Sequence, residues 1–112
     1  IQCIPMIETC TALENLDDIL AVPGVDVIYV GPSDLSVNLG LGRGNNDGAP
    51  AFDDALSAIL ESCKRHGVVP GIHSNAALAK QRTEAGFRVV TVAEDDTAML
   101  TGFETVLRGL PR

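Results

Sequence analysis

The sequence has little positive charge, no long apolar run and no paired-cysteine motif. Its 112 residues include 8 Lys and Arg against 15 Asp and Glu, which gives a formal net charge of −7. A nucleic-acid-binding face needs clustered basic residues, so this balance argues against nucleic acid and against anionic membrane surfaces as partners. The apolar runs are also far shorter than the roughly 20 residues that span a bilayer, so we expect no membrane segment.

The three cysteines are Cys3, Cys10 and Cys63, an odd number without CxxC spacing. This usage indicates reduced, buried thiols in a cytoplasmic protein. No basic leader followed by a hydrophobic core opens the chain, so we expect no secretory signal. The chain begins at Ile1 inside an apolar run, and we therefore expect a fragment or a processed piece of a longer protein.

Apolar runs alternate four times with amphipathic segments, which predicts an α/β fold with parallel strands. The runs are nearly continuous in apolar residues, as in strands that are covered on both faces. The predicted strands are residues 3–8, 25–30, 68–72 and 89–92, and the predicted helices are residues 11–20, 51–66, 76–85 and 96–108. A (β/α)8 TIM barrel takes roughly 250 residues, so four units fit half of one. We predict one partial barrel domain over residues 1–112, with a four-stranded open sheet as the alternative.

Several residues mark the predicted helix ends. Thr11 and Glu14 have capping-box spacing, and Asn75 is placed to cap the third helix. Gly67 and Gly86 follow the second and third helices, where glycine commonly ends a helix. His66 is interpreted as a partner of the helix dipole, and residues 40–50, rich in Gly and Asn, as a mobile surface loop.

Two carboxylates lie just beyond predicted strands. Glu8 closes the first apolar run, and Asp34 follows the second in the segment Gly-Pro-Ser-Asp. In a parallel sheet the strand C-termini open onto one face, where ligands bind, and two carboxylates there are a half-set of ligands for a hard divalent cation. The alternatives are an ion pair of Glu8 with a Lys or Arg, and a helix N-cap role for Asp34.

Four short motifs carry a family resemblance. They are IET at residues 7–9, AVPGVD at residues 21–26, GPSDLS at residues 31–36 and PGI at residues 70–72. Together they resemble the HpcH/HpaI aldolases, which are class II, metal-dependent enzymes acting on pyruvate-type enolates. The resemblance covers essentially the whole chain and corresponds to the C-terminal half of the family's TIM barrel.

The resemblance implies roles for individual residues. Glu8 and Asp34 match the two metal-binding carboxylates, with Mg²⁺, Mn²⁺ or Co²⁺ as the expected ion. The backbone from Gly31 to Asp34 matches the stretch that holds the substrate carboxylate, with Ser33 either part of this site or only a turn residue.

Two further positions of the substrate site depart from the family pattern. Met6 stands where members often have glutamine, and His73 follows PGI where an aliphatic residue is common. We expect both to adjoin the substrate and to alter substrate preference, although His73 also fits a purely structural role.

The function implied by the resemblance is a carbon–carbon lyase that cleaves or forms 4-hydroxy-2-oxo acids, with pyruvate and an aldehyde as partners. The family's proton-transfer histidine and carbonyl-binding arginine belong to its N-terminal half, so catalytic residues are not expected within these 112 residues. We expect a homo-oligomer. The alternatives are a CoA-ester or citrate lyase-like subunit, and a truncated, non-catalytic binding or assembly module.

Overall fold

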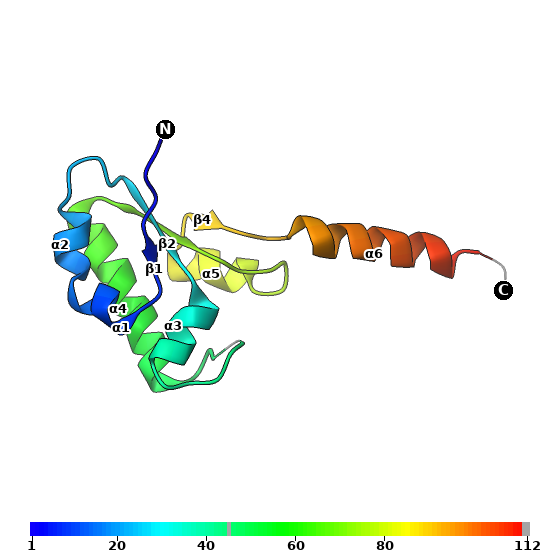
Figure 1. Ribbon diagram of the computed structural model, residues 1–112, viewed down its shortest axis with the longest axis horizontal. Coiled ribbons are helices and arrows are strands. Elements are labelled where there is room, and N and C mark those ends of the chain that lie inside the picture. Colours follow the sequence, from blue (N-terminus) through cyan, green and yellow to red (C-terminus); the bar gives the residue numbers. More distant parts are fainter. Residues whose placement is uncertain (45, 111–112) are drawn as a thin grey trace.

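A computed structural model describes residues 1–44 and 46–110, and its centre is a single four-stranded sheet (Figure 1). The strands lie in the order β1-β2-β3-β4, and each neighbouring pair is parallel. Their bounds are β1 Met6–Ile7, β2 Val27–Val30, β3 Val69–Ile72 and β4 Val89–Val90. Because sequential parallel strands alternate with helices, the fold is α/β with four consecutive units of the TIM-barrel type, as predicted.

Helices follow each strand. Their bounds are α1 Cys10–Glu14, α2 Leu16–Leu20, α3 Pro32–Asn38, α4 Pro50–His66, α5 Ala79–Ala85 and α6 Asp95–Arg108. Within the described residues, no helix has the length and apolar character needed to cross a membrane.

The core lies between one face of the sheet and helix α4. Ile7, Val30 and Ile72 occupy one row across β1, β2 and β3, and all three are completely buried. Phe52 and Ile59 of α4 are buried in the same cluster. The apolar stripe of α4 therefore covers this face of the sheet, and strand alternation sends the intervening side chains to the other face.

That other face of the sheet is largely open in the described residues. Met6 and Val89 are 51% and 42% exposed, and Tyr29 lies between their strands with its hydroxyl hydrogen-bonded to Thr91. Gly71 makes room for the tyrosine ring, because a Cβ there would lie 2.8 Å from a Tyr29 ring carbon. In a closed barrel this face would be the interior.

The first strand is shorter than predicted. Residues 1–5 lie outside β1, and Cys3 is exposed, so the expectation of a buried thiol is wrong for Cys3. The reason is that β1 is an edge strand in the described residues and has a partner only in β2. Cys63 is buried as expected, and this burial raises the pKa of its thiol to about 11.

The first predicted helix is two helices, and its predicted cap is wrong. The chain breaks at Asn15 between α1 and α2. Thr9, not Thr11, is the N-cap, and its Oγ1 accepts a hydrogen bond of 3.0 Å from the Ala12 amide. Helix α1 therefore begins at Cys10, earlier than predicted, because the threonine that caps it is the residue directly after Glu8.

The later helix ends agree better with the sequence. Gly67 and Gly86 end α4 and α5 with φ angles of 69° and 120°, which favour glycine. Asn75 caps a turn rather than α5 itself, because its Oδ1 accepts hydrogen bonds from the amides of Ala77 and Leu78 while the helix begins at Ala79.

Helix α6 projects away from the rest of the molecule (Figure 1). None of its residues is buried, and its large apolar side chains are more than half exposed. The radius of gyration is 16.6 Å, whereas a compact domain of this length has about 13 Å. The apolar stripe predicted for this helix exists, but it has no core to cover in the described residues.

Candidate functional site

The strand ends bring four residues into one row. The last paired row of the sheet is Ile7, Val30, Ile72 and Val90, so the next row is Glu8, Gly31, His73 and Thr91. Amide hydrogen bonds from Gly31, His73 and Thr91 to the carbonyls of Ile7, Val30 and Ile72 extend the ladder into this row. Alternation directs the row away from the helix-covered face. Glu8 and His73 therefore share the open face at the C-terminal end of the sheet.

The Glu8 carboxylate lies over Gly31, the residue that directly follows β2. A Cβ placed on Gly31 would be 2.5 Å from Glu8 Oε2 and 3.2 Å from Met6 Cε. Gly31 is buried and lacks a side chain, so the carboxylate and the methionine methyl occupy the space above it. Among residues 1–44 and 46–110, no Lys, Arg or His forms an ion pair with Glu8, which does not support the structural alternative for this residue.

Helix α3 begins directly after this row. Gly31 is its N-cap and Pro32 its first residue, so Ser33 and Asp34 lie in its first turn as predicted. The alternative that Asp34 is the N-cap is wrong. Asp34 is exposed. It lies in the helix turn that follows Gly31, the glycine beneath the Glu8 carboxylate.

Two carboxylates follow neighbouring strands, because Glu8 comes directly after β1 and Asp34 lies in the first turn of α3, which follows β2. Carboxylate oxygens suit hard divalent cations, and such ions often keep waters or substrate oxygens in their other positions. In the described part of the chain there is no group of three or more His, Cys, Asp or Glu residues that could hold a metal by themselves.

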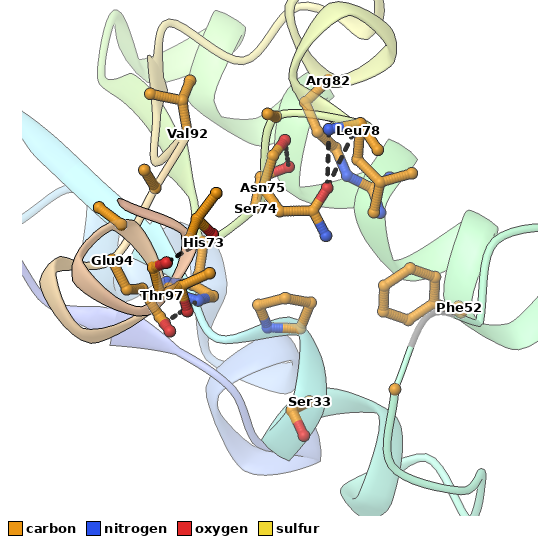
Figure 2. Close-up of a pocket in the computed structure, with 17 residues that line it drawn as sticks. Ser33, Phe52, His73, Ser74, Asn75, Leu78, Arg82, Val92, Glu94 and Thr97 are labelled. Carbon is orange, nitrogen blue, oxygen red and sulfur yellow. Dashed lines mark hydrogen bonds and ion pairs between the residues drawn. The ribbon is translucent and has the colours of Figure 1, made fainter. Parts of the chain in front are cut away.

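A cavity of about 880 Å³ opens beside the row (Figure 2). Ser33 lies on one side of it, Phe52 on another, and His73 with Glu94 and Thr97 on a third. Of the predicted site residues, Ser33 and His73 line this cavity. Met6, Glu8, Gly31 and Asp34 do not line it; Gly31 and Asp34 adjoin the lining residues Pro32 and Ser33 in sequence.

His73 is held by a carboxylate that sequence reasoning missed. Its Nε2 lies 2.9 Å from Oε1 of Glu94, and both side chains are about half exposed. Glu94 follows β4 and is the N-cap of α6. The missed signal is a carboxylate soon after an apolar run, the same pattern that identified Glu8.

Arg82 is a second residue that the sequence did not reveal. Its guanidinium is almost fully buried in the cavity wall, Nη1 lies 2.8 Å from Asp47 Oδ1, and Nε has no hydrogen-bond partner in the described residues. Gln81 also donates to Asp47, at 3.3 Å. The Gly- and Asn-rich segment, predicted to be a mobile loop, is thus bonded to α5 at Asp47.

A separate polar cluster joins α2 to α4. Asp17 accepts hydrogen bonds from the hydroxyl of Ser62, from Arg65 Nη2 at 2.8 Å and from His66 Nε2 at 3.1 Å. These bonds, the one from Ser62 first, hold the pKa of Asp17 below its usual value. His66 lies in the last turn of α4 as predicted and contacts Asp17 of α2, so it belongs to the scaffold.

The comparison with known sequences assigns the family. The sequence model of the HpcH/HpaI aldolase/citrate lyase family matches residues 1–101. The chain therefore belongs to the HpcH/HpaI aldolase/citrate lyase family.

Curated relatives carry aldolase names. The chain is 39% identical over 101 residues to the 4-hydroxy-2-oxo-heptane-1,7-dioate aldolase of Klebsiella pneumoniae, covering 89% of this chain and 37% of that protein. It is 36% identical over 110 residues to the hydroxypyruvate/pyruvate aldolase of Paraburkholderia phytofirmans, covering 96% and 41%. The chain thus spans about two fifths of the length of these relatives.

Solved structures agree on the fold. A HpcH/HpaI aldolase/citrate lyase family protein from Burkholderia cenocepacia superposes with a TM-score of 0.85 at 33% identity, covering 96% of this chain and 42% of that one. The HpcH/HpaI aldolase from Desulfitobacterium hafniense gives 0.80 at 30% identity, covering 99% and 44%.

Proposed function

We propose that this chain forms the C-terminal half of a metal-dependent aldolase that cleaves or forms 4-hydroxy-2-oxo acids, with pyruvate as the enolate donor. The observation that carries the proposal is the Glu8 carboxylate, which lies over Gly31 without a basic partner in the described residues. Aldolase names among the relatives support the reaction class. The Klebsiella relative is named for a heptane-1,7-dioate, and a further relative, from Pseudomonas putida, is named for a 6-sulfogluconate, so the substrates in the names of the relatives differ.

Glu8 and Asp34 would hold the cation, for which Mg²⁺, Mn²⁺ and Co²⁺ are the candidates because oxygen ligands suit them. A divalent cation bound there would polarise the 2-oxo group and stabilise the negative charge that develops during carbon–carbon cleavage.

The residues around Gly31 would bind the donor half of the substrate. The Ser33 and Asp34 amides lie in the first turn of α3, and the first turn of a helix leaves amide groups free for a carboxylate. Met6 Cε lies against Gly31, so Met6 would form the apolar side of this subsite, and His73 would lie on the side of the cavity. Proton transfer and binding of the carbonyl oxygen would come from the rest of the barrel.

The protein is proposed to act in the cytoplasm as a homo-oligomer, with the 2-oxo acid and the aldehyde as its small-molecule partners. The three cysteines are free, which supports a reducing compartment.

The test uses the complete barrel protein that contains this chain. Glu8→Ala and Asp34→Ala should each lose bound Mn²⁺ and lower kcat for pyruvate release by at least about 100-fold, since Lewis-acid stabilisation contributes several kcal/mol. Asp54→Ala is the matched control, because Asp54 is an exposed carboxylate on α4. Circular dichroism should be unchanged in all three variants. Activity within tenfold of the parent at unchanged metal content would contradict the proposal.

A further inference from the structure

Each side chain of the cavity wall that can carry positive charge has a carboxylate partner. Among the described residues that line it, only Arg82 and His73 can carry positive charge. Arg82 lies 2.8 Å from the Asp47 carboxylate, and His73 lies 2.9 Å from that of Glu94. The wall therefore offers no uncompensated cation to an anionic ligand.

The remaining polar groups of the wall are neutral. Hydroxyls of Ser33, Ser74 and Thr97 line the cavity together with the amide of Asn75. Asn75 Oδ1 already accepts bonds from two backbone amides, so its NH₂ group is the part left for a ligand. Hydroxyl and amide groups of this kind pair well with hydroxyl groups.

His73 stands at the border between the strand-end row and this cavity. Gly31 separates it from Glu8 within the row. Neighbouring strands lie about 4.8 Å apart, so the Cα atoms of Glu8 and His73 are roughly 10 Å apart. If the donor half of a 4-hydroxy-2-oxo acid lies at Glu8, Asp34 and the residues around Gly31, as the proposed function requires, the aldehyde-derived half would extend from this subsite toward His73 and the cavity.

We propose that His73, oriented by Glu94, selects an uncharged, hydroxyl-bearing aldehyde as the acceptor. With Nε2–H donating to Glu94, the other ring nitrogen, Nδ1, is left to accept a hydrogen bond from the acceptor's hydroxyl group. The Glu94 carboxylate disfavours an acceptor that ends in a carboxylate, since like charges repel. His73 is thus the specificity-determining residue and Glu94 its positioning residue, and both assignments rest on the proposed aldolase function.

The experiment measures kcat/KM for aldol addition of pyruvate to three aldehydes in the complete barrel protein with Mn²⁺. Glycolaldehyde carries the hydroxyl, propanal is its near-isostere without it, and succinic semialdehyde carries a carboxylate. The parent should prefer glycolaldehyde over propanal by about tenfold, the value of one good hydrogen bond. His73→Leu should abolish this preference.

The Glu94 variants separate positioning from charge. Glu94→Ala should lose most of the glycolaldehyde preference, chiefly through KM. Glu94→Gln keeps an acceptor for the His73 Nε2–H and should restore that preference, while it raises relative activity on succinic semialdehyde. His66→Gln is the matched control, because His66 also contacts a carboxylate but lies outside the cavity, on α4. Its aldehyde preferences should equal those of the parent.

Exchange of the pyruvate methyl protons in D₂O, followed by NMR, tests enolate formation without any aldehyde. It therefore tests the aldolase proposal separately from the proposal that His73 selects the aldehyde. If the parent exchanges these protons and His73→Leu keeps the parent's aldehyde preference, the selection proposal is wrong and the aldolase proposal stands. If the parent does not exchange them with any divalent metal, both proposals fall.

Discussion

Gly31 has no side chain, and this absence decides where the Glu8 carboxylate can lie. A Cβ at this position would approach Glu8 Oε2 to 2.5 Å, while its other near neighbours are Met6 Cε and Glu8 Cβ at 3.2 and 3.3 Å. These neighbours are side-chain atoms, so the fold can adjust by moving them. The carboxylate, however, must leave its place above residue 31.

We therefore predict that Gly31→Ala folds normally but weakens Mn²⁺ binding by about ten- to hundredfold, as displaced supporting groups commonly do in metal sites. Calorimetric titration of the complete protein measures the affinity. Gly42→Ala is the control, since no atom lies within 4 Å of a Cβ there. Equal affinity in parent and Gly31→Ala would show that the position of Glu8 does not matter for the metal.

Asp17 supports a pH-dependent prediction. Its carboxyl group accepts hydrogen bonds from Ser62, Arg65 and His66, and the first two are the largest causes of its lowered pKa. A carboxyl group with a pKa lowered by folding stabilises the protein above its unfolded pKa, and this contribution is lost as the pH falls through the lowered folded pKa.

Asp17→Asn should consequently lower the urea midpoint at pH 7, and its difference from the parent should shrink as the pH falls below the ordinary aspartate value of 3.8. Asp18→Asn, an exposed neighbour on the same helix turn, should show little change at either pH. A deficit for Asp17→Asn that stays constant from pH 7 to pH 3 would contradict the role of the charged carboxylate.

At the scale of elements, the segment before α4 is fixed by a buried ion pair. Arg82 of α5 has a side chain only 5% exposed, and its partner Asp47 is 16% exposed. Removing one member of such a pair leaves the other charge in a poorly solvated place, at a cost of about 3–5 kcal/mol.

Arg82→Met should accordingly destabilise the protein by about 3 kcal/mol and increase hydrogen exchange of the amides at residues 46–48. Chemical denaturation and exchange mass spectrometry measure the two effects. Arg88→Met replaces an exposed arginine and should change stability by less than about 0.5 kcal/mol. If exchange at residues 46–48 were unchanged, the pair would not hold this segment.

The elements themselves were predictable where the pattern is local. The stripe of α4, the Gly67 that caps its C-terminus and the existence of four strands all depend on neighbours within a few residues, and the structure confirms them. Each strand is shorter than its predicted range. The break at Asn15 and the cap at Thr9 were missed, because capping depends on which of two nearby threonines aligns its hydroxyl with a free amide.

The site was predictable only in part, for a similar reason. The sequence predicted that Glu8 and Asp34 would lie on one face because parallel strands share a direction, and the strand register shows Glu8 and His73 in one row. The pairing of His73 with Glu94, and of Arg82 with Asp47, joins residues more than 20 positions apart. No spacing rule reveals such a pairing, since it depends on how separate loops fold over the end of the sheet.

At the scale of the whole molecule, α6 presents an apolar face that nothing covers within the described residues. Leu100, Phe103 and Val106 are at least 60% exposed, and the helix extends away from the sheet (Figure 1). A contiguous exposed apolar face of this kind marks an interaction surface.

We predict that this face lies in the subunit contact of a homo-oligomer. Phe103→Glu should lower the mass of the complete protein in light scattering, because a charge would be buried in the contact. Thr105→Glu, at an exposed polar position of the same helix, is the control and should keep the parent mass. A complete parent protein that is monomeric would contradict the prediction.

The open face of the sheet leads to the last prediction. β1 and β4 are both edge strands in the described residues, and the face between them exposes Met6 and Val89. Unpaired strand edges promote pairing with another chain. The proposed function also assigns proton transfer to groups outside these 112 residues. The 112-residue chain alone should therefore self-associate and release no pyruvate from a 4-hydroxy-2-oxo acid, even with added Mn²⁺. Light scattering and a coupled pyruvate assay measure both properties, and co-expression with the remaining barrel units should restore activity. A stable, active monomer of this chain alone would overturn the half-barrel proposal and the placement of the proton-transfer groups elsewhere.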